Sequence, residues 1–458
     1  MLTACLIVRN EERFLPDCLA SLAGVADRIV VVDTGSSDRT IEIARKQGAD
    51  VFPFEWCDDF AAARNFSIST VRSGFVLAID ADERLGPGAG RVLKQALRKD
   101  RFDLGLLPLH DAQRLESTPQ AVLSGVERRG EPVLLPRLMR RTEDLRWDGI
   151  VHEQVSAWLM ASARRVEIIE APLVHYGAVP ELRRDRRKDQ RNRELLERHL
   201  ASHPGDMVMR TFLARELGRT GERSAALAQT TQAWNDLLAL GENAARVNVV
   251  QPATLHAWLL LESRRTAEAL EVIADARMYS AEHPNLSLLE GVACEQMALD
   301  STLPAEQDAW LKQGESALGR CLSAGERPQL SEVLPGATHW AAATRLGTVR
   351  LLAGRPIQAR EAFERALKTK PDHLEARLGL VEALIDSNLL GQAIAATEPL
   401  LKHDTADAWL LAAAAVGRMG QVEDLRLFAS QTRQALTRAP FAAPHRKLRW
   451  REIERELA

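Results

Sequence analysis

The chain has 458 residues, of which 46% are apolar and 27% are charged, and its formal net charge is −3. This length predicts two or more domains, at roughly 100–200 residues each. A charge so close to neutral gives no argument for nucleic acid as a partner, and we expect none. No run of about 18 apolar residues occurs, so we expect no transmembrane segment.

The cysteines and the first residues bear on the location of the protein. Five cysteines are scattered without a CxxC pair: Cys5, Cys18, Cys57, Cys294 and Cys321. This pattern favours free thiols in a reducing compartment. Residues 2–8 are apolar and have no basic leader before them, which predicts a strand rather than a signal peptide. We therefore expect a cytoplasmic protein.

The first 110 residues alternate between two kinds of pattern. Largely apolar runs predict buried strands at residues 2–8, 28–33 and 75–79, and residues 49–54 predict a further strand. The stretches between them predict helices, as in residues 12–22, where apolar residues recur at helical spacing. Strands that alternate with helices of about 10–15 residues predict βαβ units and a parallel sheet.

The apolar run at residues 75–79 is followed by two carboxylates, Asp80 and Asp82. Such a run predicts a strand buried on both faces, and ligands of open α/β sheets bind just beyond the carboxyl ends of these strands. Two carboxylates at that place favour a hard divalent cation bridged to phosphate oxygens. The alternative is that both aspartates are turn residues or caps of the next helix.

Between Asp111 and Gly177 the alternation stops. Residues 133–139 and 166–169 look like strands with no helix between them, and residues 147–153 look like a strand that runs into a short helix. We expect this part to form the antiparallel edge of the sheet and the acceptor side of the domain.

Strand patterns are absent after Pro180. Residues 183–193 hold seven basic and two acidic residues, which predicts either a solvated linker helix or a contact to a diphosphate or an acidic acceptor. Farther on, small and large residues fall at the offsets of a tetratricopeptide repeat of about 34 residues: Leu346, Gly347, Gly354, Ala359, Phe363, Ala366 and Pro371. Weaker copies precede and follow this one, and a generic helical bundle is the alternative.

Four segments of the first domain form a recognisable set: residues 6–12 (LIVRNEE), 31–40 (VVDTGSSDRT), 63–65 (ARN) and 80–82 (DAD). Together they resemble the nucleotide-sugar glycosyltransferases of family 2, which have the GT-A fold. The resemblance is good over residues 2–110 and loose over residues 111–178. It implies an α/β GT-A domain with a Rossmann-like, mostly parallel sheet.

The arrangement as a whole, a family 2 domain followed by tetratricopeptide-like helices, resembles the bacterial glycosyltransferases that include the sublancin-type peptide S-glycosyltransferases. We expect a GT-A domain at residues 1–180, a basic helical linker at 181–205 and an all-α helical repeat domain at 206–458. In the similar proteins the helical part supports dimerisation or acceptor binding, so a homodimer or a protein partner is implied here.

The resemblance implies a binding site for a nucleotide sugar, most simply a UDP-sugar. Asp33 is expected to hold the base, and Arg64 the diphosphate or the base–ribose edge. Their alternatives are an Asx turn for Asp33 and a solvent-facing side chain for Arg64. The implied donor-binding residues are Val8, Asn10, Glu11, Asp33, Gly35, Arg64, Asn65 and Asp80. Thr34 stands where many family members carry a second aspartate, which bears on the details of nucleotide recognition.

The resemblance also implies a divalent cation, Mn²⁺ or Mg²⁺. Asp80 and Asp82 are the DxD element of the family, in which the first residue reaches the ribose or the metal and the second is the firmer metal ligand. His175 lies where several metal-dependent relatives place a histidine ligand, and a purely structural histidine is the alternative.

An inverting transfer needs a general base that takes the proton of the acceptor. We predict that Glu153 is this base, and Asp144 and Asp111 are the alternative candidates. Residues 142–144 (TED) match the base motif of polysaccharide synthases, but we expect them in a hairpin turn and take the match as coincidence. The QxxRW motif of processive synthases is absent, which argues against a polymer-extruding enzyme.

Three functions therefore compete. The first is an active, metal-dependent, inverting glycosyltransferase with a peptide, protein or glycan acceptor. The second is a nucleotidyltransferase, which we disfavour because residues 9–12 (RNEE) contain no glycine for a phosphate loop. The third is a protein-binding scaffold of tetratricopeptide type in which the nucleotide-sugar-binding domain is inactive.

Overall fold

The computed structural model describes residues 1–179, 182, 188–241, 248–280, 282–325, 327, 329 and 331–457. The chain divides into two compact units. Unit 1 comprises Met1–Leu259 with Glu326–Val333, and unit 2 comprises Leu260–Gly325 with Leu334–Ala458. The basic run predicted at residues 183–193 is only partly described, because residues 183–187 lie outside the described residues.

Unit 1 begins with a nine-stranded sheet, counted over the described residues. The strands run in the order β3-β2-β1-β4-β7-β6-β9-β5, and β8 pairs with β6. Their bounds are β1 (Leu2–Val8), β2 (Arg28–Asp33), β3 (Asp50–Pro53), β4 (Phe75–Ala78), β5 (Glu83–Leu85), β6 (Leu104–Ala112), β7 (Arg128–Arg140), β8 (Val166–Ile168) and β9 (Leu173–His175). The first four strands are mutually parallel, which confirms the sequence prediction of a mostly parallel sheet.

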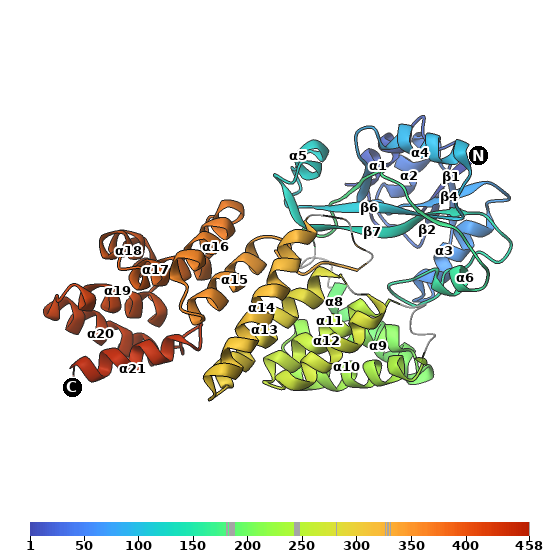
Figure 1. The fold of residues 1–458 in the computed structure, drawn as a ribbon. Helices are drawn as coiled ribbons and strands as arrows, with labels where there is room; N and C mark the ends of the chain where they lie inside the picture. Colours follow the sequence, from blue (N-terminus) through green and yellow to red (C-terminus); the bar gives the residue numbers. More distant parts are fainter. Residues whose placement is uncertain are drawn as a thin grey trace. The chain divides into compact units, whose positions relative to one another are not determined.

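Two layers of helices cover this sheet (Figure 1). Apolar residues of α1 and α4 pack on one face, and those of α3 and α6 pack on the other. The helices are α1 (Leu15–Leu22), α2 (Thr40–Lys46), α3 (Phe60–Ser69), α4 (Ala89–Lys99), α5 (Pro119–Leu123) and α6 (Ser156–Met160). β1, β2 and β4 are largely buried and carry continuous apolar runs rather than alternating ones, whereas β3 at the edge is partly exposed.

The second half of the sheet departs from the sequence prediction in two ways. β7 is antiparallel to both β4 and β6, as expected, but it lies inside the sheet between them and not at an edge. The strand predicted at residues 147–153 is wrong, since this segment is a loop with one isolated bridge between Asp148 and Gln154. Its local apolar residues are explained by packing on helices, which a short apolar run cannot distinguish from strand pairing.

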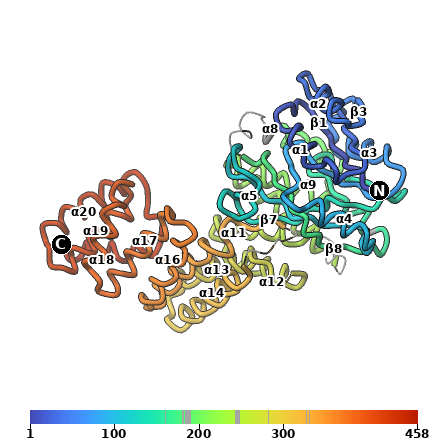
Figure 2. The backbone as a smooth tube through the Cα atoms, turned by 90° about the horizontal axis from the view of Figure 1, so that it is seen from above, coloured from blue at the N-terminus to red at the C-terminus, as the bar shows by residue number. Residues whose placement is uncertain are grey.

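Helices continue in both units after the sheet. Those that lie in unit 1 or start there are α8 (Lys188–Ser202), α9 (Met207–Arg219), α10 (Arg223–Leu238) and α11 (Val250–Glu262). Unit 2 holds α12 (Thr266–Tyr279), α13 (Pro284–Asp300), α14 (Pro304–Ala324), α15 (Trp340–Leu352), α16 (Pro356–Thr369), α17 (Leu374–Asp386), α18 (Leu390–Thr397), η2 (Glu398–His403), α19 (Ala406–Arg418), α20 (Val422–Leu436) and α21 (Arg446–Leu457). Within unit 2, consecutive helices turn back on one another along the tube of Figure 2.

One aromatic side chain shows how the repeat signature of unit 2 works. Phe363 of α16 is 1% exposed and lies between α15 and α17. A Cβ atom added to Gly347 of α15 or to Gly379 of α17 would come within 2.6 or 2.3 Å of the Phe363 ring. The two glycines therefore let three helices close around one ring, which is the steric mechanism of stacked helical pairs.

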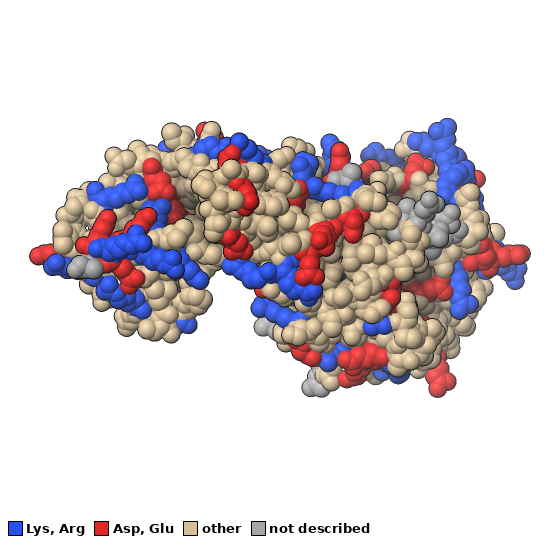
Figure 3. All heavy atoms as spheres, turned by 60° about the horizontal axis from the view of Figure 1, so that its bottom comes forward, with Lys and Arg blue, Asp and Glu red and all other residues tan. Residues whose placement is uncertain are grey.

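Three general expectations can be compared with the described residues. No helix among them is long and apolar enough to cross a membrane. All five cysteines are free thiols, in keeping with the sequence prediction. On the face drawn in Figure 3, basic and acidic side chains are intermingled, as the small net charge suggests.

Candidate active site

The predicted site residues cluster at the carboxyl ends of three neighbouring parallel strands. The register pairs Val8 at the end of β1 with Asp33 at the end of β2. On its other side β1 pairs with β4, whose last residue, Ala78, is two positions before Asp80. This is the edge of an open α/β sheet at which ligands bind.

Asp33 has one occupied and one unoccupied carboxylate oxygen. Its Oδ1 accepts hydrogen bonds of 3.0 Å from the main-chain N–H groups of Gly35 and Ser36, which is the Asx turn considered in the sequence analysis. Its Oδ2 is buried and has no hydrogen-bond partner among the described residues. Because an unpaired buried acceptor is costly, this oxygen marks a place where a ligand N–H would be stabilising. Gly35 has φ +104°, which only glycine adopts readily.

The loop after β1 is fastened to the loop after β2. Asn10 Oδ1 accepts from the Ser37 main-chain N–H at 2.8 Å, and the Asn10 N–H donates to Ser36 Oγ at 2.9 Å. The Glu11 N–H donates to Thr40 Oγ1 at 2.8 Å. These contacts shape the floor of the predicted nucleotide site through the main chain.

Thr34 turns its side chain back to β1. Its hydroxyl donates to the carbonyl oxygen of Val8 at 3.1 Å, and the side chain is buried. A threonine at this place therefore closes the strand end rather than presenting a polar group to the site.

Arg64 of α3 joins two of the predicted residues. Its Nη2 lies 2.8 Å from Asp80 Oδ1, and its Nε lies 2.5 Å from Glu153 Oε1. The guanidinium also lies 5.2 Å from the ring centre of Trp147. Burial alone would lower the pKa of Arg64, but the two carboxylates raise that pKa above its ordinary value. Asp80 and Glu153, which are 73 positions apart in the chain, thus both pair with the buried guanidinium group of Arg64.

Arg137 of β7 is a site residue that the sequence analysis missed. It lies 3.1 Å from Asp80 Oδ2 and also pairs with Glu83, which is 1% exposed. Its Nε is a buried donor without a partner among the described residues. The signal that could have found it is an arginine inside the apolar strand segment 133–139, where a charge is expected only with a partner.

The two arginines shift the pKa values of the acids between them. Burial alone would raise the pKa of Asp80, but Arg64 and Arg137 hold it well below its ordinary value. Burial raises the pKa of Glu83 to about 7, with Arg137 opposing the rise. Asp80 is therefore an ionised carboxylate, and each of its two oxygens accepts a hydrogen bond from a guanidinium group.

Asp82 and His175 face each other because β5 and β9 are paired. His175 Nε2 lies 3.7 Å from Asp82 Oδ1, and its Nδ1 lies 2.7 Å from Asp111 Oδ1. A Cβ at Gly177 would fall 2.1 Å from Asp82 Oδ2 and 2.6 Å from His175 Nε2, so the space beside both groups requires glycine. Burial alone would lower the pKa of His175, but Asp111 and Asp82 raise it to about 9.

These groups fit a divalent cation in part. Among the described residues, no group of three or more His, Cys, Asp or Glu side chains could hold a metal. Asp82 and His175 supply one oxygen and one nitrogen donor, and Mg²⁺ or Mn²⁺ in transferase sites usually keeps several waters and substrate phosphates. The proton on His175 competes with a metal for Nε2, so binding would be coupled to its release. Each oxygen of Asp80, the third predicted ligand, is paired with an arginine.

Two predicted residues serve other purposes in the structure. Asn65 makes a two-way pair with the main chain of Trp147, with distances of 2.9 and 2.8 Å. Asp144 pairs with Arg164, and residues 142–145 form a turn after β7 as expected, but no strand follows directly. Neither side chain joins the cluster around Arg64.

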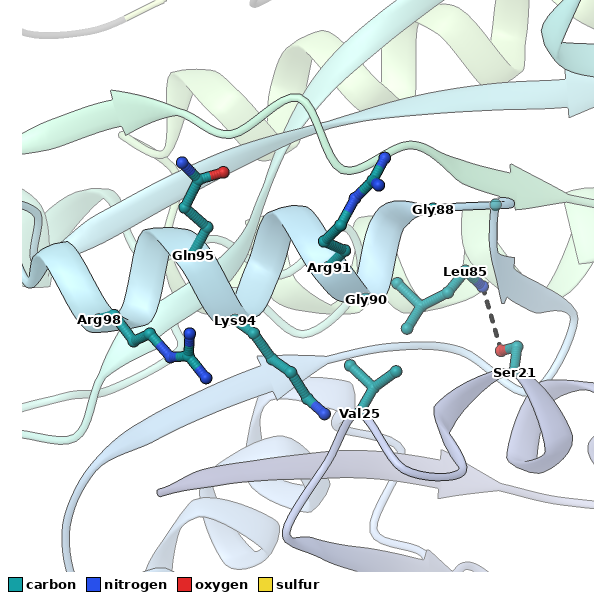
Figure 4. Close-up of a pocket in the computed structure, with 10 residues that line it drawn as sticks. Ser21, Val25, Leu85, Gly88, Gly90, Arg91, Lys94, Gln95 and Arg98 are labelled. Atoms are coloured by element: carbon teal, nitrogen blue, oxygen red, sulfur yellow. Dashed lines mark hydrogen bonds between the residues drawn. The ribbon is translucent and has the colours of Figure 1, made fainter.

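A cavity of about 730 Å³ lies along α4 (Figure 4). Its lining includes three basic side chains of α4, Arg91, Lys94 and Arg98. No residue of the predicted donor, metal or base sets lines it.

Comparison with known proteins identifies the first domain. Residues 3–153 match the model for glycosyl transferase family 2. The chain carries a family 2 glycosyltransferase domain. Residues 350–415 match a tetratricopeptide repeat model, which confirms the helical repeats. The family 2 match contains Asp33, Arg64 and Asp82 and ends at Glu153, whereas His175 lies outside it.

Two similar proteins each align with just under half of this chain. A TPR repeat-containing protein of Synechococcus elongatus is 34% identical over 228 residues, which are 48% of this chain and 53% of that protein. The SPbeta prophage-derived glycosyltransferase SunS of Bacillus subtilis is 26% identical over 219 residues, which are 47% of this chain and 49% of that protein. The chain thus spans about half the length of these curated relatives. A tetratricopeptide repeat protein from Parabacteroides merdae aligns with a TM-score of 0.41 at 15% identity, over 59% of this chain and 94% of that one.

Proposed function

We propose that this chain transfers a sugar from a UDP-sugar to a peptide, protein or glycan acceptor, with inversion and with the help of Mn²⁺ or Mg²⁺. The observation that carries the proposal is the unpartnered, buried Oδ2 of Asp33 at the ligand-binding edge of a family 2 domain. A uracil base carries the N–H that such an oxygen requires, and a site built for that hydrogen bond rejects bases that lack it.

The donor would lie across the ends of β1, β2 and β4. Gly35 keeps the floor free of side chains, so that the base can approach the main chain closely. Arg64 is fixed by its two carboxylates and presents a permanent charge for the ribose–diphosphate region. Asp80, occupied by two arginines, orients them rather than acting as the main metal ligand.

Asp82 and His175 would hold the cation. When bound there, Mn²⁺ or Mg²⁺ supplies the positive charge that stabilises a departing diphosphate. Asp111 orients the imidazole through Nδ1, as carboxylates commonly do for histidine ligands. Gly177 keeps the space in front of both donors clear.

Glu153 is our candidate for the general base. Its side chain is 12% exposed, and Arg64 fixes one oxygen, Oε1, which leaves Oε2 to receive a proton from the acceptor. Asn65 supports this arrangement, because it clamps Trp147 near the start of the loop that carries Glu153. We therefore assign Asn65 to the loop rather than to the donor.

The helical repeats at residues 206–458, joined by the linker at 181–205, are proposed to bind the acceptor, a protein partner or a second copy of the chain. The tetratricopeptide match supports this role, since such repeats stack into extended binding surfaces.

The test is hydrolysis or transfer of UDP-sugars with Mn²⁺, followed by the same assay with a chelator. Turnover that the chelator abolishes supports the proposal, and the anomer of the product, read by NMR, decides inversion. Turnover that persists in chelator would remove the metal from the proposal.

A second candidate function is the protein-binding scaffold with an inactive first domain. The specific observation is that guanidinium groups occupy both oxygens of Asp80. Absence of turnover with every UDP-sugar, together with no binding of UDP by calorimetry, would decide for the scaffold.

A further inference from the structure

Glu153 sits in a short loop, residues 148–154, that is closed at its base. The main-chain groups of Asp148 and Gln154 exchange two hydrogen bonds of 2.8 Å. Inside the loop, Gly149 has φ +100° and His152 has φ +56°. A histidine in the left-handed region costs free energy and persists only where its surroundings hold it. The holding contacts therefore decide where Glu153 lies.

Those contacts come from α9, which follows the family 2 match in the chain. The His152 ring stacks on Phe212 with ring centroids 4.0 Å apart and planes 21° apart. Val151 is buried in the same apolar cluster as Phe212, together with residues of α8 and α9. A Cβ at Gly149 would lie 3.1 Å from Met209 Cε, so the loop packs closely against the side chains of α9.

The start of α3, the helix that carries Arg64, rests on the same pair of helices. The Phe60 N–H donates to the carbonyl oxygen of Ile150 at 3.0 Å, which ties α3 to the loop. Arg191 of α8 lies 5.2 Å from the centre of the Phe60 ring. Asp58, with φ +60°, pairs with Arg198 of α8 at 3.1 Å. Both members of the Arg64–Glu153 pair are thus carried by segments that lie on α8 and α9.

We propose that α8 and α9 form part of the active-site scaffold, and that Phe212 is a positioning residue that fixes Glu153 through His152. The inference rests on the proposed function, because a general base must be held close to the productive geometry. A displacement of about 1 Å can cost on the order of 100-fold in rate. The family 2 domain therefore depends on a helix outside its own matched residues.

Three variants test the inference. Phe212→Leu keeps an apolar side chain but removes the ring that stacks on His152, and Phe212→Tyr keeps the ring. Leu217→Ala is the matched control, because Leu217 is buried in the same cluster on the same helix. We expect Phe212→Leu to lower kcat by about 10- to 100-fold with an unchanged KM for the UDP-sugar. Phe212→Tyr should have a kcat close to that of the wild-type protein. Leu217→Ala should be less stable but should also keep the wild-type kcat.

Hydrogen exchange of the amides at residues 148–154 gives a readout that does not depend on turnover. We expect faster exchange there in Phe212→Leu and wild-type exchange in Leu217→Ala. Unchanged exchange in Phe212→Leu, or equal effects of the two variants on kcat and exchange, would overturn the inference. If the wild-type protein showed no transferase activity, the proposed function would be refuted. The hydrogen-exchange comparison would still show whether Phe212 holds the loop in place.

Discussion

Replacing Asp33 by Asn should separate the stability of the protein from its affinity for a uridine nucleotide. In Asp33→Asn the amide oxygen can keep the hydrogen bonds that Oδ1 accepts from Gly35 and Ser36. The amide NH₂ takes the place of Oδ2, the buried oxygen without a partner. The variant therefore retains the turn but cannot accept a hydrogen bond from the base.

The magnitude follows from that one oxygen. A hydrogen bond to a charged group contributes about 1.5–3 kcal/mol, which corresponds to about 10- to 150-fold weaker binding of UDP. A neutral amide costs less to bury than a carboxylate without a partner, so the free energy of unfolding of the ligand-free variant should stay equal or rise. Affinity and stability should therefore not fall together.

The assay is calorimetric titration with UDP and with CDP, alongside urea unfolding. Cytosine has no N–H at the corresponding ring position, so the wild-type protein should prefer UDP and the Asn variant should lose the preference. Asp38→Asn is the control, since both oxygens of Asp38 have partners in Thr40 and Glu12. It should cost about 1 kcal/mol of stability and leave UDP affinity unchanged. Wild-type affinity for UDP in Asp33→Asn would refute the assignment of Asp33 to the base.

Three further predictions concern other parts of the chain. Glu153→Gln should lower kcat by about 100-fold or more with an unchanged KM for the donor, measured by steady-state kinetics, and an unchanged kcat would exclude it as the base. Gly177→Ala should weaken metal-dependent turnover, since the new Cβ meets Asp82, and titration with Mn²⁺ should show a raised half-saturating concentration. In unit 2, burial alone would raise the pKa of Glu382, but Arg446 holds it below its ordinary value of 4.5. The stability that this pair contributes is present above pH 4.5 and lost as the pH falls below it. Thermal unfolding between pH 3 and 7 should show this decline, and Glu382→Gln should flatten it.

Local sequence patterns predicted the parallel half of the sheet well. The run at residues 28–33 was predictable as a buried strand because it is short, rich in Val and Ile, and followed by the turn residues 34–38. The repeat in unit 2 was equally readable, since Gly347 and Phe363 combine a small and a large residue at a fixed offset.

The pairing partners of the site could not be predicted in the same way. Arg137 meets Glu83 across 54 positions and Arg64 meets Glu153 across 89, and both depend on a sheet order that local patterns do not encode. His175 reaches Asp82 only because β5 and β9 pair. The segment at 147–153 misled the prediction, because Ile150 and Val151 pack with residues of α8 and α9 and not in a strand pair.

The ring of Phe363, enclosed by Gly347 and Gly379, has a consequence for engineering unit 2. The thickness of that ring sets the spacing of three helices. Substitutions at positions 347, 363 and 379 should therefore depend on one another in any set of engineered variants. Alanine at either glycine should be tolerated only with a smaller side chain at 363, and the combined variants should deviate from additivity. Randomising these sites together, rather than one at a time, is the way to recover alternative packings.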